Sequence, residues 1–151
     1  MEQMGVNIAI LQETKVMDGL HTRFSSGYNV IATSAPSVRQ GGVALVWKDG
    51  DAYEVEETRT WGPNVLAFQL VTGRHRYYVV GCYIPPSDLS ALEDVRRAWS
   101  QCPSGARPLL VGDLNINLES PRDERDVEIA EHVDHMNLTD LTRHFLQCCQ
   151  Q

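Results

Sequence analysis

Residues 65–86 read VLAFQLVTGRHRYYVVGCYIPP, two runs of β-branched, aromatic and other apolar residues on either side of a polar segment. The runs Val65–Val71 and Tyr77–Tyr83 predict two strands, because such side chains pack well on a half-buried pleated surface. The polar residues between them, Arg74 to Arg76, are expected in a hairpin turn. These two strands place a β-sheet at the centre of the predicted fold.

Segments on both sides of this hairpin add further strands, and the segments after it also add helices. Four further short apolar runs predict strands: Val6–Leu11, Tyr28–Thr33, Val43–Trp47 and Pro108–Val111. A first helix is expected from Ser90, which has the spacing of a capping box with Glu93, a second over Asp123–Met136 and a third from about Thr139. This order predicts a mixed α/β fold of the α+β kind, with five strands before any helix.

Composition limits the class of protein. The 151 residues are 42% hydrophobic and 22% charged, which predicts one globular domain over residues 1–151. A chain of this length buries about 68–70% of its unfolded surface, so it needs no disulfide or metal for a core. No apolar run approaches the roughly 20 residues of a membrane span, and no secretory signal is recognisable. The four cysteines show no C-x-x-C pair. We therefore expect an intracellular protein, cytoplasmic or nuclear, without membrane association.

The formal net charge of −7 argues against tight nonspecific binding to a phosphate backbone, which depends on Lys and Arg. It does not exclude a phosphate substrate bridged by a metal ion, because carboxylates hold the cation and the cation supplies the positive charge. Arg74, His75 and Arg76 could touch a phosphate backbone, but a solvated turn is the favoured interpretation.

Two carboxylates, Glu13 and Asp113, stand where a buried strand ends and a loop begins. Strand ends position side chains rigidly beside an open loop, so such carboxylates are candidates for metal binding or catalysis. Taken singly, each has a simpler explanation: Glu13 as a solvated residue and Asp113 as part of a turn with Asn115. His132 and His135, with Glu128 and Glu131 nearby, have a spacing that could hold a metal, but a solvated helix face is favoured.

Four motifs in order resemble the endonuclease/exonuclease/phosphatase superfamily. They are Ile10-Leu11-Gln12-Glu13-Thr14-Lys15, Gly41-Gly42-Val43-Ala44-Leu45, Tyr83-Ile84-Pro85-Pro86 and Gly112-Asp113-Leu114-Asn115. Within the superfamily they are most similar to the endonuclease domain of LINE-type (non-LTR) retrotransposons, found beside a reverse transcriptase and related to apurinic/apyrimidinic endonucleases. The resemblance runs from about Val6 to Phe145. It implies a DNase I-like fold, a two-sheet β-sandwich flanked by helices, and an Mg²⁺-dependent DNA endonuclease.

The resemblance also implies a role for four residues. Glu13 matches the glutamate that holds Mg²⁺ or Mn²⁺, and Asp113 matches the aspartate that activates or orients the attacking water. Asn115, expected on the same face of an extended segment as Asp113, would bind the scissile phosphate or fix the aspartate. Tyr83 matches a tyrosine near the phosphate, although an aromatic residue at a strand end needs no such role. Asp140 is interpreted as a helix cap.

Two family motifs are missing from the sequence: an N-terminal strand with an asparagine, and a C-terminal Ser-Asp-His. We therefore expect an incomplete domain, truncated at both ends, whose endonuclease activity is weakened or lost. We also expect uncovered strand edges to cause self-association, as a homo-oligomer or a strand-exchanged dimer. The alternative is a non-catalytic, nuclease-derived fragment that binds metal, nucleic acid or protein.

Overall fold

The structure, a computed structural model, describes residues 6–50, 52–118, 120–139 and 141. Within it the chain divides into two compact units, residues 1–115 and 116–151. Asp140, most of the helix expected from Thr139, Cys148 and Cys149 lie outside the described residues. Two cysteines that are described, Cys82 and Cys102, are free thiols.

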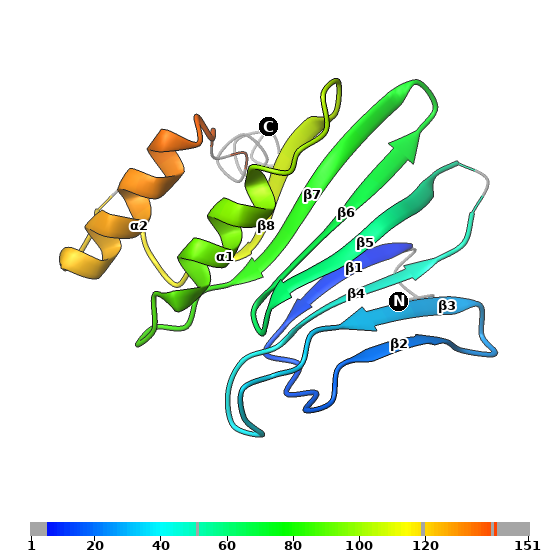
Figure 1. Ribbon diagram of the computed structural model, residues 1–151, viewed down its shortest axis with the longest axis horizontal. Coiled ribbons are helices and arrows are strands. Elements are labelled where there is room, and N and C mark those ends of the chain that lie inside the picture. Colours follow the sequence, from blue (N-terminus) through cyan, green and yellow to red (C-terminus); the bar gives the residue numbers. More distant parts are fainter. Residues whose placement is uncertain (1–5, 51, 119, 140, 142–151) are drawn as a thin grey trace, which may run out of the picture. The chain divides into compact units, whose positions relative to one another are not determined.

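The first unit contains two four-stranded sheets and one helix (Figure 1). The first sheet has the order β1-β4-β3-β2 and is antiparallel throughout. Its strands are β1 (Ile8–Gln12), β2 (Leu20–Arg23), β3 (Tyr28–Ala32) and β4 (Val43–Lys48). The second sheet has the order β5-β6-β7-β8. Its strands are β5 (Glu54–Gly62), β6 (Val65–Thr72), β7 (His75–Tyr83) and β8 (Arg107–Asp113).

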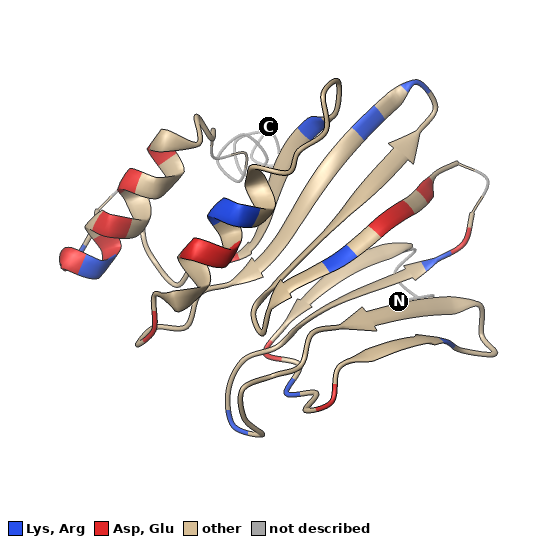
Figure 2. Cartoon of the chain, viewed as in Figure 1, with Lys and Arg blue, Asp and Glu red and all other residues tan. Residues whose placement is uncertain are grey.

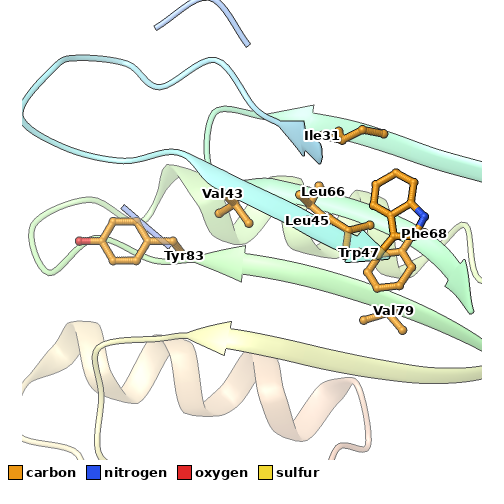
Figure 3. Packing of buried hydrophobic residues seen from close by; sticks show 8 residues of the cluster. All are labelled: Ile31, Val43, Leu45, Trp47, Leu66, Phe68, Val79 and Tyr83. Atoms are coloured by element: carbon orange, nitrogen blue, oxygen red, sulfur yellow. The ribbon is translucent and has the colours of Figure 1, made fainter. Parts of the chain in front are cut away.

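The core lies between the two sheets. Its buried cluster takes side chains from both sheets: Ile31, Val43, Leu45, Trp47, Leu66, Phe68, Val79 and Tyr83 (Figure 3). Because successive side chains of a strand point to opposite faces, Leu66 and Phe68 of β6 face the first sheet. Figure 3 shows Tyr83 at one end of the cluster, with its hydroxyl turned away from the other labelled side chains. The predicted sandwich of two sheets is thus confirmed.

Helix α1 (Ser90–Trp99) packs against β5, β6 and β7 of the second sheet. It buries Ala91, Leu92, Val95 and Ala98, and the hydroxyl of Tyr78 donates a hydrogen bond to the carbonyl of Ala98 at 3.0 Å. The expected capping box is wrong. The residue before the helix is Leu89, and the side chain of Asp88 accepts from the backbone N–H of Ser90 at 2.8 Å, so Asp88 satisfies the exposed donor.

Helix α2 (Glu124–His135) belongs to the second unit and begins where the sequence predicts. The side chain of its N-cap, Asp123, accepts from the N–H of Asp126 at 2.9 Å. Acidic residues dominate this helix (Figure 2). The ring Nδ1–H of His132 donates to the carbonyl of Glu128, and that of His135 to the carbonyl of Glu131. These bonds within one helix favour the solvated-face interpretation of the histidines.

The prediction of five strands before the first helix is wrong, because β2 and β5 also precede it. Both are edge strands whose sequences, LHTR and EVEETRTWG, are mostly polar, so neither carries an apolar run. Strand β5 also has a bulge between Glu56 and Arg59, where Glu57 adopts a φ of 48°, which breaks the alternation of side chains.

Candidate active site

The four predicted site residues lie together in the first unit. Glu13 follows β1 of the first sheet, whereas Tyr83 and Asp113 end the neighbouring parallel strands β7 and β8 and are paired in register. One open cavity of about 550 Å³ has Glu13, Tyr83, Asp113 and Asn115 among its lining residues. The rest of its lining is Gln12, Arg39, Gln40, Pro86 and Ser87. The sandwich therefore gathers residues that are far apart in the sequence into one site.

A second cavity, of about 500 Å³, contains none of the predicted site residues. Trp47, Asp49, Tyr53 and Glu54 are among the residues that line it.

The carboxylate of Glu13 is held by two neighbours. The hydroxyl of Tyr83 donates a hydrogen bond to its Oε1, and the ammonium of Lys15 lies 3.5 Å from its Oε2. The hydrogen bond from Tyr83 and the positive charge of Lys15 lower the pKa of Glu13 below its ordinary value of 4.5. Glu13 is therefore ionised at neutral pH and places a negative charge at the cavity.

Tyr83 is the protonated partner in this pair. Burial, the hydrogen bond to Glu13 and the negative charges of Glu13 and Asp113 raise its pKa to about 12, while a contact with Asn115 acts in the opposite direction. Its hydroxyl therefore stays a hydrogen-bond donor throughout the physiological range.

A turn after β8 holds Asp113 and Asn115 together. The backbone N–H of Asn115 donates to Oδ1 of Asp113 at 2.9 Å, and the Asn115 side chain donates to the carbonyl of Ile84 at 3.0 Å. The expectation that Asn115 continues an extended segment is wrong, because it lies beyond β8 with a φ of 53°. Asparagine tolerates this left-handed conformation well, and the turn still brings it to the cavity.

The loop that carries Glu13 rests on the two glycines before β4. The N–H of Thr14 donates to the carbonyl of Gly42 at 3.2 Å, and the N–H of Lys15 to that of Gly41 at 3.0 Å. Gly42 has a φ of +90°, and a Cβ there would lie 2.5 Å from Oγ1 of Thr14. Only glycine fits this close approach without strain. This contact connects the second motif with the first.

The donor set of the cavity fits a hard cation. Magnesium is commonly bound through one or two carboxylates, with water and substrate phosphate completing its shell, and Glu13 and Asp113 are two such carboxylates. Among the described residues no group of three or more His, Cys, Asp or Glu side chains could hold a metal, so a closed structural site of the zinc type is not formed there.

Lys15 and Arg39 are two cations of this site to which the sequence motifs assign no role. Lys15 pairs with Glu13, and Arg39 lines the cavity. Each stands beside a motif, two residues after Glu13 and two residues before Gly41, and this position was the available signal.

Comparisons with known proteins bear on the fold. No protein-family model matches the chain, and no curated protein matches it in sequence. Among solved structures, the endonuclease domain of TRAS1, a telomere-specific non-LTR retrotransposon, is similar with a TM-score of 0.66 and 19% identity. The AP endonuclease LMAP from Leishmania major has a TM-score of 0.66 at 15% identity, and a humanized D. rerio TDP2 has 0.52 at 13%.

The similarity covers 89% of this chain for TRAS1, 96% for LMAP and 85% for TDP2. The chain spans 60%, 62% and 58% of those three structures respectively. All three are members of the endonuclease/exonuclease/phosphatase superfamily, the group that the four sequence motifs resemble. The DNase I-like α+β sandwich predicted from that resemblance is confirmed.

Proposed function

We propose that this chain is an endonuclease-type domain that hydrolyses phosphodiester bonds of DNA with the help of Mg²⁺ or Mn²⁺. The observation that carries the proposal is that Glu13, Tyr83, Asp113 and Asn115, which come from three of the four sequence motifs, line a single open cavity. The names of the similar structures, a retrotransposon endonuclease domain and an AP endonuclease, support the same reaction class. The four sequence motifs support the more specific proposal of an endonuclease of the retrotransposon type.

In this proposal Glu13 holds the cation, Asp113 acts at the scissile phosphate, and Tyr83 and Asn115 hold these two carboxylates in place. Asp113 takes a proton from the attacking water as the water oxygen forms a bond to phosphorus and the bond from phosphorus to the leaving sugar oxygen breaks. Asn115 fixes the Asp113 carboxylate through its backbone N–H. Tyr83 keeps Glu13 oriented and ionised. When bound, the divalent cation supplies Lewis-acid polarisation of the phosphate and offsets charge on the leaving oxygen.

We further propose that turnover by residues 1–151 is weakened. The lining of the cavity, as far as the structure describes it, includes no histidine that could stabilise the pentavalent transition state or protonate the leaving oxygen. Catalytic groups that act as a unit lose much of their rate when one is absent, often by 10³-fold or more.

The experiment is nicking of supercoiled plasmid by the purified chain with Mg²⁺, with Mn²⁺ and with EDTA. We expect slow, metal-dependent nicking that Glu13→Gln and Asp113→Asn each reduce by at least about tenfold, since each removes one charge with little change of shape. Asp49→Asn is the matched control, because Asp49 is an exposed carboxylate paired with Arg23 and lines the other cavity. It should nick like the unsubstituted chain.

Nicking that survives both site substitutions, or no nicking by the folded chain, would contradict the enzyme proposal. The second outcome would leave the alternative function, a nuclease-derived module that binds metal, nucleic acid or a protein partner without turnover.

Three other expectations remain proposals: a single partial domain over residues 1–151, self-association, and a cytoplasmic or nuclear location. Sedimentation velocity would test self-association.

Within the part of the chain that the structure describes, no helix has the length and apolarity needed to cross a membrane.

A further inference from the structure

Asn64 is a buried polar residue between the two sheets. It immediately precedes β6, and only 2% of its surface is exposed. A buried amide must satisfy its hydrogen-bonding groups, because an unpaired polar group in a buried position destabilises the fold. The hydrogen-bond partners of Asn64 therefore indicate its role in the structure.

Two of its hydrogen bonds reach the two halves of the candidate site. The side-chain Oδ1 of Asn64 accepts from the backbone N–H of Gly42 at 3.0 Å. Its backbone carbonyl accepts from the N–H of Tyr83 at 2.9 Å. Gly42 immediately precedes β4 of the first sheet, and Tyr83 is the last residue of β7 in the second. Asn64 thus connects the sheets at the end of the sandwich where the cavity opens.

The connection continues from both residues to Glu13. The carbonyls of Gly42 and Gly41 accept from the N–H groups of Thr14 and Lys15, the two residues that follow Glu13. On the other side, the hydroxyl of Tyr83 donates directly to the Glu13 carboxylate. One buried amide therefore supports both the backbone that carries Glu13 and the phenol that orients its side chain.

The turn formed by Gly41 and Gly42 is closely packed against Asn64 and its neighbours. A Cβ at Gly41 would lie 2.8 Å from Oδ1 of Asn64 and 2.7 Å from Cδ of Pro36, which shows how closely the side chain seats against this turn. If the acceptor is removed, the N–H of Gly42 is left without its partner in a buried position, and the turn must move to find another.

We propose that Asn64 is a positioning residue for the metal-binding carboxylate Glu13, acting through Gly42 and Tyr83. The inference rests on the proposed function in that Glu13 is taken as the metal ligand. Residues that orient a metal ligand without touching the metal affect affinity strongly, by about 10–100-fold when replaced.

Asn64→Leu tests the proposal, because leucine has a similar volume and no acceptor. Asn64→Asp is the conservative variant, since it keeps an oxygen that can accept from Gly42. Gln69→Met is the matched control: Gln69 is also 2% exposed in β6, but its side chain pairs with Glu57 and Arg76, outside the site.

Two readouts are measured for each variant. Amide hydrogen exchange of Thr14 and Lys15 measures local opening of the loop after Glu13. The amides of β6 serve as an internal reference for global stability. Binding of Mn²⁺ alone, followed by the electron paramagnetic resonance signal of the free ion, reports the carboxylate. In Asn64→Leu we expect the Thr14 and Lys15 amides to exchange at least tenfold faster and the Mn²⁺ dissociation constant to rise about tenfold or more.

Asn64→Asp should restore both readouts to within about threefold of the unsubstituted chain, and Gln69→Met should change neither relative to the β6 reference. Unchanged Thr14 and Lys15 exchange in Asn64→Leu, or equal effects in Gln69→Met, would overturn the proposal. If Asn64→Leu does not fold, Asn64→Ser takes its place, because the shorter hydroxyl does not reach Gly42. If the unsubstituted chain binds no Mn²⁺, the proposed metal site fails, whereas the exchange rates still decide the role of Asn64.

Discussion

The hydrogen bond between Tyr83 and Glu13 joins the two sheets at the level of single side chains. It keeps the carboxylate ionised and the phenol protonated, since it lowers one pKa and raises the other. A metal-binding carboxylate needs to be ionised, and a donor beside it must not lose its proton. The pair therefore suits a site that works across a broad range of pH.

Replacing Tyr83 by phenylalanine should raise the pKa of Glu13 toward its ordinary value of 4.5, because the largest cause of the shift is the hydrogen bond from Tyr83. The direction in which stability changes with pH follows from the linkage between protonation and folding. A lowered folded-state pKa contributes stability that is present above the unfolded value and lost as the pH falls through the folded value. In Tyr83→Phe this contribution to stability should be smaller, and its loss should be complete at a higher pH.

The measurement is a carbon-13 NMR titration of the Glu13 carboxyl carbon from neutral to acid pH. Tyr53→Phe is the control, since the hydroxyl of Tyr53 donates to the carbonyl of Lys48, at the opposite end of β4 from the residue that pairs with Gln12. A Glu13 titration curve that is the same in Tyr83→Phe and in the unsubstituted chain would show that the hydrogen bond has no influence on the carboxylate.

At the scale of elements, the turn into β4 supports the loop after β1. We expect Gly42→Ala to destabilise the chain by about 1–2 kcal/mol for the positive φ and by a further ~1–3 kcal/mol for crowding, because the new Cβ meets Thr14 and Lys15. The same substitution should reduce nicking, since it displaces the segment that carries Glu13.

Gly73→Ala is the matched substitution for Gly42→Ala. Gly73 also has a positive φ, of 57°, but a Cβ there has nothing within 4 Å. It should therefore cost only about 1–2 kcal/mol in urea unfolding and leave nicking unchanged. Equal losses of stability and activity in the two variants would mean that the Gly42 contact does not support the site.

At the scale of the whole first unit, the sandwich depends on the apolar layer between its sheets. Phe68, 1% exposed, lies in this layer with Trp47 and Leu45 (Figure 3). We expect Phe68→Ala to cost about 3–5 kcal/mol, a large part of the 5–15 kcal/mol that stabilises an ordinary domain. Urea unfolding followed by tryptophan fluorescence measures this loss.

Phe24→Ala is the control, because Phe24 is 51% exposed and an exposed substitution usually changes stability by less than about 0.5 kcal/mol. Similar losses at the two phenylalanines would argue against a core between the sheets. Because Glu13 follows a strand of one sheet and Asp113 ends a strand of the other, loosening this layer should also reduce nicking.

The sequence by itself determined six of the eight strands in the described part of the chain and the second helix, and it named the candidate site residues. Strands β6 and β7 are enclosed on both sides, so apolar side chains occupy nearly every position and leave a clear pattern. The edge strands β1 and β8 keep apolar runs, whereas the edge strands β2 and β5 are mostly polar, as a sheet edge tolerates, and left no such pattern.

Only the tertiary structure decided how the site is held. The sequence motifs name Glu13, Tyr83 and Asp113, but the contact of Tyr83 with Glu13 exists because two sheets stack and bring the ends of their strands together. Asn64 belongs to none of these motifs and had no local signal, since its partners Gly42 and Tyr83 are distant in the chain. Contacts between sheets depend on packing, and a linear pattern records only the burial of each residue.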